Sequence, residues 1–109
     1  MLTFNGHDKA VRCVCLDSED RFLFSGSMDS TLKMWDVSEF EQDFTRECVK
    51  TFAGHEAHIL DVKITKDDKF VFTASGDKTA MMWNIATGQV VSNLFIYNIE
   101  VSNVQKKGS

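Results

Sequence analysis

The sequence predicts an all-β protein built from two copies of one small antiparallel sheet. Two stretches of the chain match each other without a gap at a constant offset of 48 residues, as from Trp35 to Trp83. In addition, apolar residues occur in short runs rich in Val, Ile, Phe, Trp and Thr, separated by polar turns, which is typical of consecutive strands. Because a unit that repeats with this period cannot bury its own faces, we expect the two copies to stack.

The internal repeat contains twelve identical pairs of residues. In the first copy these are Phe4, Gly6, His7, Val14, Asp20, Phe22, Phe24, Ser27, Asp29, Thr31, Met34 and Trp35. Each of them recurs 48 positions later. The function is therefore expected to belong to an assembled array of units rather than to one pocket.

Three strands are expected within each copy, since none of the apolar runs is long enough for a helix. Their predicted positions are residues 11–16, 22–25 and 31–37, and again residues 59–64, 70–73 and 81–85. A fourth strand precedes the second Gly-His pair at residues 48–52, with further versions at residues 2–4 and 89–95. Each complete unit is therefore a four-stranded meander. Consecutive apolar residues within the strands predict that both faces of each sheet are covered.

The connection after the first copy is longer than the one after the second copy. Residues 37–47 form an irregular polar stretch, whereas the second copy crosses the same gap with Ala86-Thr87-Gly88. The longer connection carries Phe40 and Phe44, which we expect to fold back onto the sheet rather than to contact a partner.

Composition excludes several classes of function. The chain has 109 residues, a formal net charge of -4 and a pI near 5.2, and its only basic run is Lys106-Lys107, so no nucleic-acid surface is expected. No membrane span is expected either. The three cysteines, Cys13, Cys15 and Cys48, predict reduced thiols in the cytoplasm, with the nucleus as the alternative. The segment after Met1 lacks the features of a secretory signal.

The order of the motifs resembles the WD-repeat β-propeller family. Gly-His, a Val-rich strand, an acidic turn, a Ser or Thr run, an Asp, and Trp-Asp or Trp-Asn follow one another from Gly6 to Asp36 and from Gly54 to Asn84. The resemblance implies that each unit is one blade of a ring, which typically has four to eight blades. It places two repeats within residues 1–98. The predicted boundaries are about 5–47 and 53–95, with residues 2–4 as the outer strand of a preceding blade and 99–109 as a divergent, flexible tail.

The resemblance also implies a hydrogen-bond network that holds each blade together. Its members are His7, Ser25, Asp29 and Trp35 in the first copy, and His55, Thr73, Asp77 and Trp83 in the second. An unpaired buried polar group costs about 1 to 3 kcal/mol, so a fully satisfied network favours a single arrangement.

Two chemical alternatives use some of the same residues. Ser25, His7 and Asp29 are the residue types of a hydrolase triad, but the set recurs in the second copy with Thr73 in place of the serine, which an enzyme does not need. We therefore expect no catalysis. For metal binding, Cys13 and Cys15 with His7, or His55 with His58, do not supply a four-ligand set. No metal and no cofactor are expected.

The resemblance implies binding of other proteins or peptides on the rim around the ring's channel. The corresponding positions, here called the rim positions, are Ala10, Arg12, Met28, His58, Leu60 and Gly76. Arg12 is the leading candidate, because a guanidinium can pair with a carboxylate bidentately or stack on an aromatic ring.

Two blades do not close a ring, and open blades leave apolar faces and strand edges in water. The sequence therefore predicts an interaction or scaffold module that is a fragment or truncated form of a longer propeller. The alternative is a subunit that completes a ring by self-association through its open blade edges. The two readings differ in the oligomeric state that they predict for the purified chain.

Overall fold

The computed structural model describes residues 3–37 and 45–95. These residues form ten strands and no helix. The strands are β1 (Thr3–Asn5), β2 (Val11–Leu16), β3 (Phe22–Ser27), β4 (Thr31–Asp36), β5 (Thr45–Glu47), β6 (Lys50–Ala53), β7 (Ile59–Ile64), β8 (Phe70–Ser75), β9 (Thr79–Asn84) and β10 (Val90–Phe95). The fold is therefore all-β, as the sequence predicts.

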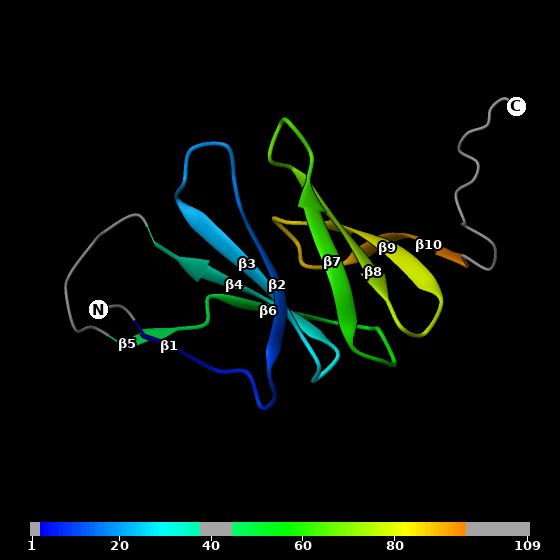
Figure 1. Cartoon of the computed structure of the whole chain (residues 1–109). Coiled ribbons are helices and arrows are strands. Elements are labelled where there is room, and N and C mark those ends of the chain that lie inside the picture. The colour runs from blue at the N-terminus through cyan, green and yellow to red at the C-terminus, as the bar shows by residue number, and fades with distance from the viewer. Residues whose placement is uncertain (1–2, 38–44, 96–109) are drawn as a thin grey trace, which may run out of the picture.

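Eight of the strands form two four-stranded antiparallel sheets (Figure 1). The first sheet has the order β2-β3-β4-β6 and the second sheet the order β7-β8-β9-β10. Both are meanders, and equivalent residues occupy equivalent register positions: Phe24 pairs with Met34 in the first sheet, and Phe72 pairs with Met82 in the second. The repeat in the sequence is thus a repeat of tertiary structure.

Strand boundaries differ from the sequence-based expectation by a few residues. β3 and β8 each continue two residues further than expected, because the ladder with the preceding strand extends to Ser27 and Ser75. The fourth strand of the first sheet begins at Lys50 rather than at Cys48. The hydrophobic runs therefore locate the strands, whereas the backbone ladders set their ends.

The prediction of an irregular stretch over residues 37–47 is wrong for its last three residues. Thr45–Glu47 forms β5, which pairs in parallel with β1, so that Phe4 lies opposite Arg46. This pairing joins segments about 40 residues apart and satisfies backbone groups that no local pattern reveals. Phe40, Phe44 and the predicted tail at 99–109 lie outside the described residues.

The hydrophobic core lies between the two sheets. The inner strands β2 and β7 are neighbours, and β3 also packs against β7 (Figure 1). The core residues come from both sheets: Phe24, Leu32, Met34 and Phe52 from the first, and Val62, Val71, Met81 and Trp83 from the second. Burial of one face of each sheet against the other therefore provides the main stabilisation.

Polar contacts add to the packing between the two sheets. The amide of Ser18, in the turn after β2, donates to Asp68 Oδ1 in the turn after β7 at 3.1 Å. From β6, the ammonium of Lys50 donates to the carbonyls of Ile85 and Ala86 at 2.8 and 2.7 Å. These bonds tie the turns of one sheet to those of the other.

The turns repeat as the strands do. Asp20 and Asp68 have φ of 57° and 60°, and Ser30 and Lys78 have φ of 75° and 72°. Positive φ is tolerated at Asp in tight turns, and the sequence repeats this residue at the same place in both copies. No helix within residues 3–37 and 45–95 is long and apolar enough to cross a membrane.

Candidate functional site

The first sheet brings His7, Ser25, Asp29 and Trp35 together in one chain of hydrogen bonds. Trp35 Nε1 donates to Ser25 Oγ at 2.8 Å, and Ser25 Oγ lies 2.7 Å from His7 Nε2. The other ring nitrogen, His7 Nδ1, lies 2.9 Å from Asp29 Oδ2. The four residues come from the segment before β2, from β3, from the β3–β4 turn and from β4.

The second sheet repeats this arrangement with a threonine in place of the serine. Trp83 Nε1 donates to Thr73 Oγ1 at 2.9 Å, and Thr73 Oγ1 lies 2.7 Å from His55 Nε2. His55 Nδ1 lies 3.1 Å from Asp77 Oδ2. Ser and Thr are interchangeable here because the network needs only the hydroxyl.

The direction of these bonds follows from the donor inventory. An indole N–H only donates, so Ser25 Oγ accepts from Trp35 and directs its own proton to His7 Nε2. His7 then carries its proton on Nδ1 and donates it to the carboxylate of Asp29. Each member therefore donates once to the next, and a neutral imidazole satisfies the whole chain.

The aspartate at the end of each chain also organises the turn around it. Asp29 Oδ1 accepts from the amide of Thr31 at 2.9 Å and from its hydroxyl at 2.6 Å, and Oδ2 accepts from the amide of Asp8 at 3.0 Å. Burial raises the pKa of Asp29, but the hydrogen bonds from Thr31, His7 and Asp8 outweigh it, so the pKa lies well below its usual range. The carboxylate is ionised at neutral pH.

Asp77 behaves in the same way. Burial again raises its pKa, and hydrogen bonds from Thr79, from the amide of Glu56 and from His55 lower it further, so that the pKa lies well below its usual range. Two aspartates at matched positions are therefore both held as anions by donors from three separate segments of their own repeat.

Four residues of this arrangement were not named among the predicted network residues. Thr31 and Thr79 donate to the aspartates, and Ser27 and Ser75 accept from the amides of those aspartates at 3.0 and 3.1 Å. All four belong to the pairs that are identical at the offset of 48 residues. The repeat itself therefore contained the signal that locates them.

The glycine before each histidine is required by the tryptophan. A Cβ added at Gly6 would lie 2.9 Å from Trp35 Cη2, and one added at Gly54 would lie 3.0 Å from Trp83 Cη2. The edge of each indole thus packs against bare backbone, which explains the Gly-His order in both copies.

The geometry of the network is unlike that of a nucleophile site. Ser25 is 4% exposed, and Thr73 is 2% exposed. Both hydroxyl oxygens already accept a bond from an indole and lie against an imidazole. A serine nucleophile needs an open approach for its substrate and a nearby oxyanion hole.

The residues considered for metal binding are dispersed. Cys13 and Cys15 are free thiols on β2, and His7 and His55 face their aspartates. In the described part of the chain, no three His, Cys, Asp or Glu side chains converge in a way that could hold a metal ion.

The rim positions lie at one end of the two inner strands. Ala10 accepts from the amide of Met28 at 2.9 Å, and His58 accepts from the amide of Gly76 at 2.9 Å. Arg12 and Leu60 each follow one residue after a strand begins, where β2 and β7 carry an irregularity in register. Such a bulge inserts an extra residue and re-aims its side chain.

These positions differ in exposure. Arg12, Leu60 and Met28 are exposed, whereas His58 is half-buried, with its ring over Gly76. The structure therefore places a cation, a branched aliphatic side chain and a thioether at equivalent or neighbouring places in the two sheets. Arg and Met are enriched at protein interfaces.

Comparison with known proteins shows the same repeat. The family described as WD domain, G-beta repeat (WD40) matches residues 1–36 and 46–84, which is more than half of the chain. The chain is 41% identical over 46 residues to nuclear distribution protein PAC1 of Candida dubliniensis, which covers 42% of the chain and 9% of that protein.

Other relatives carry different names. The chain is 40% identical over 50 residues to the mouse ribosome biogenesis protein BOP1, covering 46% of the chain and 6% of that protein. It is 45% identical over 40 residues to eukaryotic translation initiation factor 3 subunit I of Xenopus laevis, covering 37% of the chain and 12% of that protein.

The chain therefore spans about a tenth or less of the length of the first relatives, and the similarity is confined to the repeats. The family match, the two meanders and the repeated Trp-Ser/Thr-His-Asp chains agree with one another. The chain belongs to the WD40 repeat family.

Proposed function

We propose that this chain is a non-enzymatic protein-interaction module whose rim positions contact another protein or a peptide. The observation that supports this most directly is the pair of bulges at Arg12 and Leu60. Because a bulge turns a side chain out of the ladder, the two sheets present these exposed residues at matching places.

The chemistry of the rim suggests the partner's character. Arg12 offers a fork of donors that suits a carboxylate, while Met28 and Leu60 offer apolar contact beside it. A peptide segment that carries an acidic residue next to an apolar one fits this combination. Arg12 supplies orientation, and the apolar pair supplies buried area.

The network residues have a structural role in this proposal. His7, Ser25, Asp29 and Trp35, with their counterparts in the second sheet, hold the turns that carry the rim positions. Support comes from Ser27, whose hydroxyl donates to the carbonyl of Ala10 at 2.9 Å and accepts from the amide of Asp29. The network thus connects directly to the rim.

The relatives support a role in assembly without indicating a pathway. Their names range from nuclear distribution to ribosome biogenesis and translation initiation. One fold that carries such different functions leaves specificity to surface residues. The proposed location is the cytoplasm, with the nucleus as the alternative, and the free thiols of Cys13, Cys15 and Cys48 support this choice.

The test compares the proteins that are captured by the chain and by two variants. Arg12→Glu reverses the charge at the rim, and Arg21→Glu reverses an exposed arginine in the turn before β3, remote from the rim. Loss of the same bound proteins with Arg12→Glu but not with Arg21→Glu is expected. Equal loss with both variants, or with neither, contradicts a specific role for the rim.

A second measurement separates the module from a hydrolase. The hydrolase alternative predicts that Ser25→Ala abolishes turnover of an ester or peptide substrate while the melting temperature stays near normal. In the proposed function there is no turnover to lose, and Ser25→Ala lowers the melting temperature because Trp35 and His7 lose a shared partner.

A further inference from the structure

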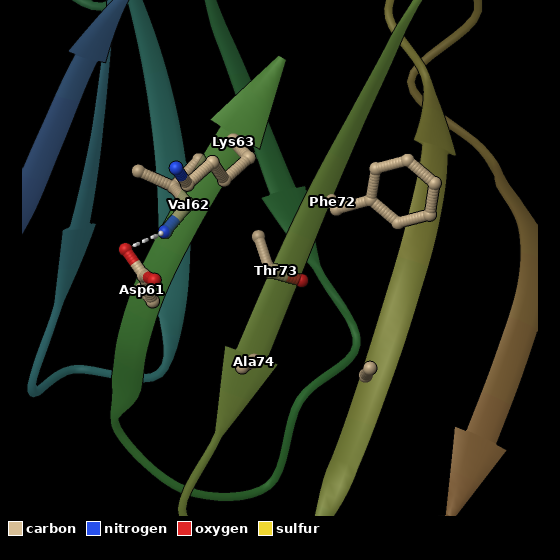
Figure 2. Close-up of a pocket in the computed structure, with 7 residues that line it drawn as sticks. Asp61, Val62, Lys63, Phe72, Thr73 and Ala74 are labelled. Atoms are coloured by element: carbon tan, nitrogen blue, oxygen red, sulfur yellow. Dashed lines mark hydrogen bonds between the residues drawn. The ribbon is translucent and has the colours of Figure 1, made fainter. Parts of the chain in front are cut away.

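The outer face of the second sheet carries two rows of side chains that run across its four strands. The register pairs Lys63, Phe72, Met82 and Ser92 in one row. It pairs Asp61, Ala74, Ala80 and Leu94 in the adjacent row. Several of these residues line a hollow of about 120 Å³, from which the ring of Phe72 projects along the sheet (Figure 2).

The same face of the first sheet is covered. Its equivalent rows are Cys15, Phe24, Met34 and Lys50, and Cys13, Gly26, Leu32 and Phe52, and they pack against the second sheet. Phe24 is 1% exposed, whereas Phe72, its counterpart by the offset of 48 residues, is 42% exposed. Leu94 is 60% exposed. A face that is core in one sheet is thus open in the other within the described residues.

A second copy of the chain does not cover this face by repeating the contact between the two sheets. At the contact, a Cβ added at Gly26 would lie 2.5 Å from Ile59 Cγ2. On the open face Ala74 carries that Cβ, and Val11 of the second copy would stand where Ile59 stands, with the same branched Cβ. The contact would therefore be too close.

The outer strand gives a second reason. Phe4 of β1 packs on Trp35 with ring centroids 5.2 Å apart, as Phe52 of β6 packs on Trp83 at 5.6 Å. β1 thus already fills the place beside the first sheet that the β10 strand of a second copy would take. Head-to-tail stacking of two copies is disfavoured at both positions.

The rows are instead complementary to themselves. If a two-fold axis runs across the strands between the rows, each row of one copy faces the other row of its partner. Asp61 then faces Lys63, Phe72 faces Ala74, and Met82 faces Ala80, and every pairing occurs twice. Opposite charges meet, and each large side chain meets a small one, which is how packed sheets interdigitate at a separation of about 10 Å.

We propose that a second copy of this chain packs on the outer face of the second sheet, β7-β8-β9-β10, to form a two-fold symmetric dimer. The contact is held by Phe72 seated over Ala74 and is aligned by Asp61 against Lys63. This surface differs from the rim, so the dimer and the rim contact are independent of each other.

The first experiment is sedimentation velocity of the 109-residue chain over about a hundredfold range of concentration, which spans a tenfold change in affinity on either side of the midpoint. A monomer that converts to a dimer and stops there is expected, because an isologous contact closes at two. A monomer at every concentration overturns the proposal, as does growth into longer assemblies.

Charge exchange tests the register. Asp61→Lys places two lysines opposite each other, and Lys63→Asp places two aspartates opposite each other, so each single change is expected to weaken the dimer at least about tenfold. The double variant Asp61→Lys with Lys63→Asp restores opposite charges and is expected to recover the dimer. No recovery in a folded double variant contradicts the proposed alignment.

A matched control distinguishes the two open faces. Phe72→Glu is expected to abolish the dimer, whereas Val14→Glu, on the opposite open face and 58% exposed, is expected to leave it intact. Loss of association with Val14→Glu instead supports head-to-tail stacking and overturns the proposal. Circular dichroism of each variant confirms that the strands remain, and the charge exchange keeps the test decisive if Phe72→Glu does not fold.

Discussion

Gly26 and Ile59 meet where the two sheets of this protein come closest. A Cβ added at Gly26 would lie 2.5 Å from Cγ2 and 2.9 Å from Cβ of Ile59, and Ile59 is fully buried. The branched side chain therefore fills the space that the missing side chain leaves. This contact lets β3 pack against β7 and brings the two halves of the core together.

Gly26→Ala is expected to destabilise the fold by roughly 1–3 kcal/mol, because the extra methyl group overpacks the contact and forces the sheets apart. The measurement is urea unfolding followed by tryptophan fluorescence. The matched control is Ala74→Ser at the equivalent position of the second sheet, which lies on the open face and is expected to change stability little. Equal effects at the two positions contradict the contact.

Thr73→Val is expected to cost about 2–5 kcal/mol, since it leaves Trp83 Nε1 and His55 Nε2 buried without their shared partner. Valine keeps the shape of threonine, so packing is preserved and the loss is that of the hydroxyl. The control is Thr51→Val, whose exposed hydroxyl accepts only from Lys33. Thermal unfolding of both variants against the parent chain gives the comparison.

Stability is expected to be constant at neutral pH and to fall as the pH is lowered through about 4. Asp29 and Asp77 have folded-state pKa values below the unfolded value of about 3.9, so their contribution is present above that value and is lost as each carboxylate is protonated. Denaturant unfolding at several pH values from 7 down to about 3 measures the slope.

An aspartate variant identifies the source of that slope. Asp77→Asn lowers stability at pH 7 and makes the fall with acid shallower, because one of the two titrating groups is gone. A variant whose acid dependence matches that of the parent chain shows that other carboxyl groups cause the fall.

The thiol of Cys15 is expected to react slowly with alkylating reagents in the folded protein. Burial and the neighbouring Cys13 raise its pKa to about 11, against an ordinary value of about 8.5. Since the thiolate is the reactive form, alkylation at pH 8 is expected to be roughly a hundredfold slower than in the unfolded chain. The rate is measured on a Cys13→Ser, Cys48→Ser variant with and without urea. Similar rates in both conditions contradict the burial of this thiol.

Much of the fold followed from local patterns. Strand positions were predicted from short runs of β-branched and aromatic residues, and the two-sheet class is confirmed by the topology. The family is confirmed by the match to WD40 repeats. The strand ends at Ser27 and Ser75 were missed, because the length of a ladder depends on the partner strand rather than on hydrophobicity.

For the candidate site, the repeat placed His7, Ser25, Asp29 and Trp35 on equivalent elements of each copy, and the structure brings them within hydrogen-bond distance. The binding role of the rim positions stays a prediction, although the bulge at Arg12 adds a physical reason for it. The predicted repeat boundaries stay a prediction as well. No local pattern indicated the pairing of β1 with β5, which depends on two segments far apart in the chain meeting in space.

The sequence by itself determined what repeats: the strands, the turns with their aspartates, and the order of residues in each hydrogen-bond chain. These features depend on spacing along the chain, which is identical in the two copies. Only the tertiary structure decided which copies of a residue are buried. Phe24 and Phe72 are the same residue in the same register, yet one is core and the other is open. Burial depends on which neighbour packs against a face, and only the first sheet has one on that side.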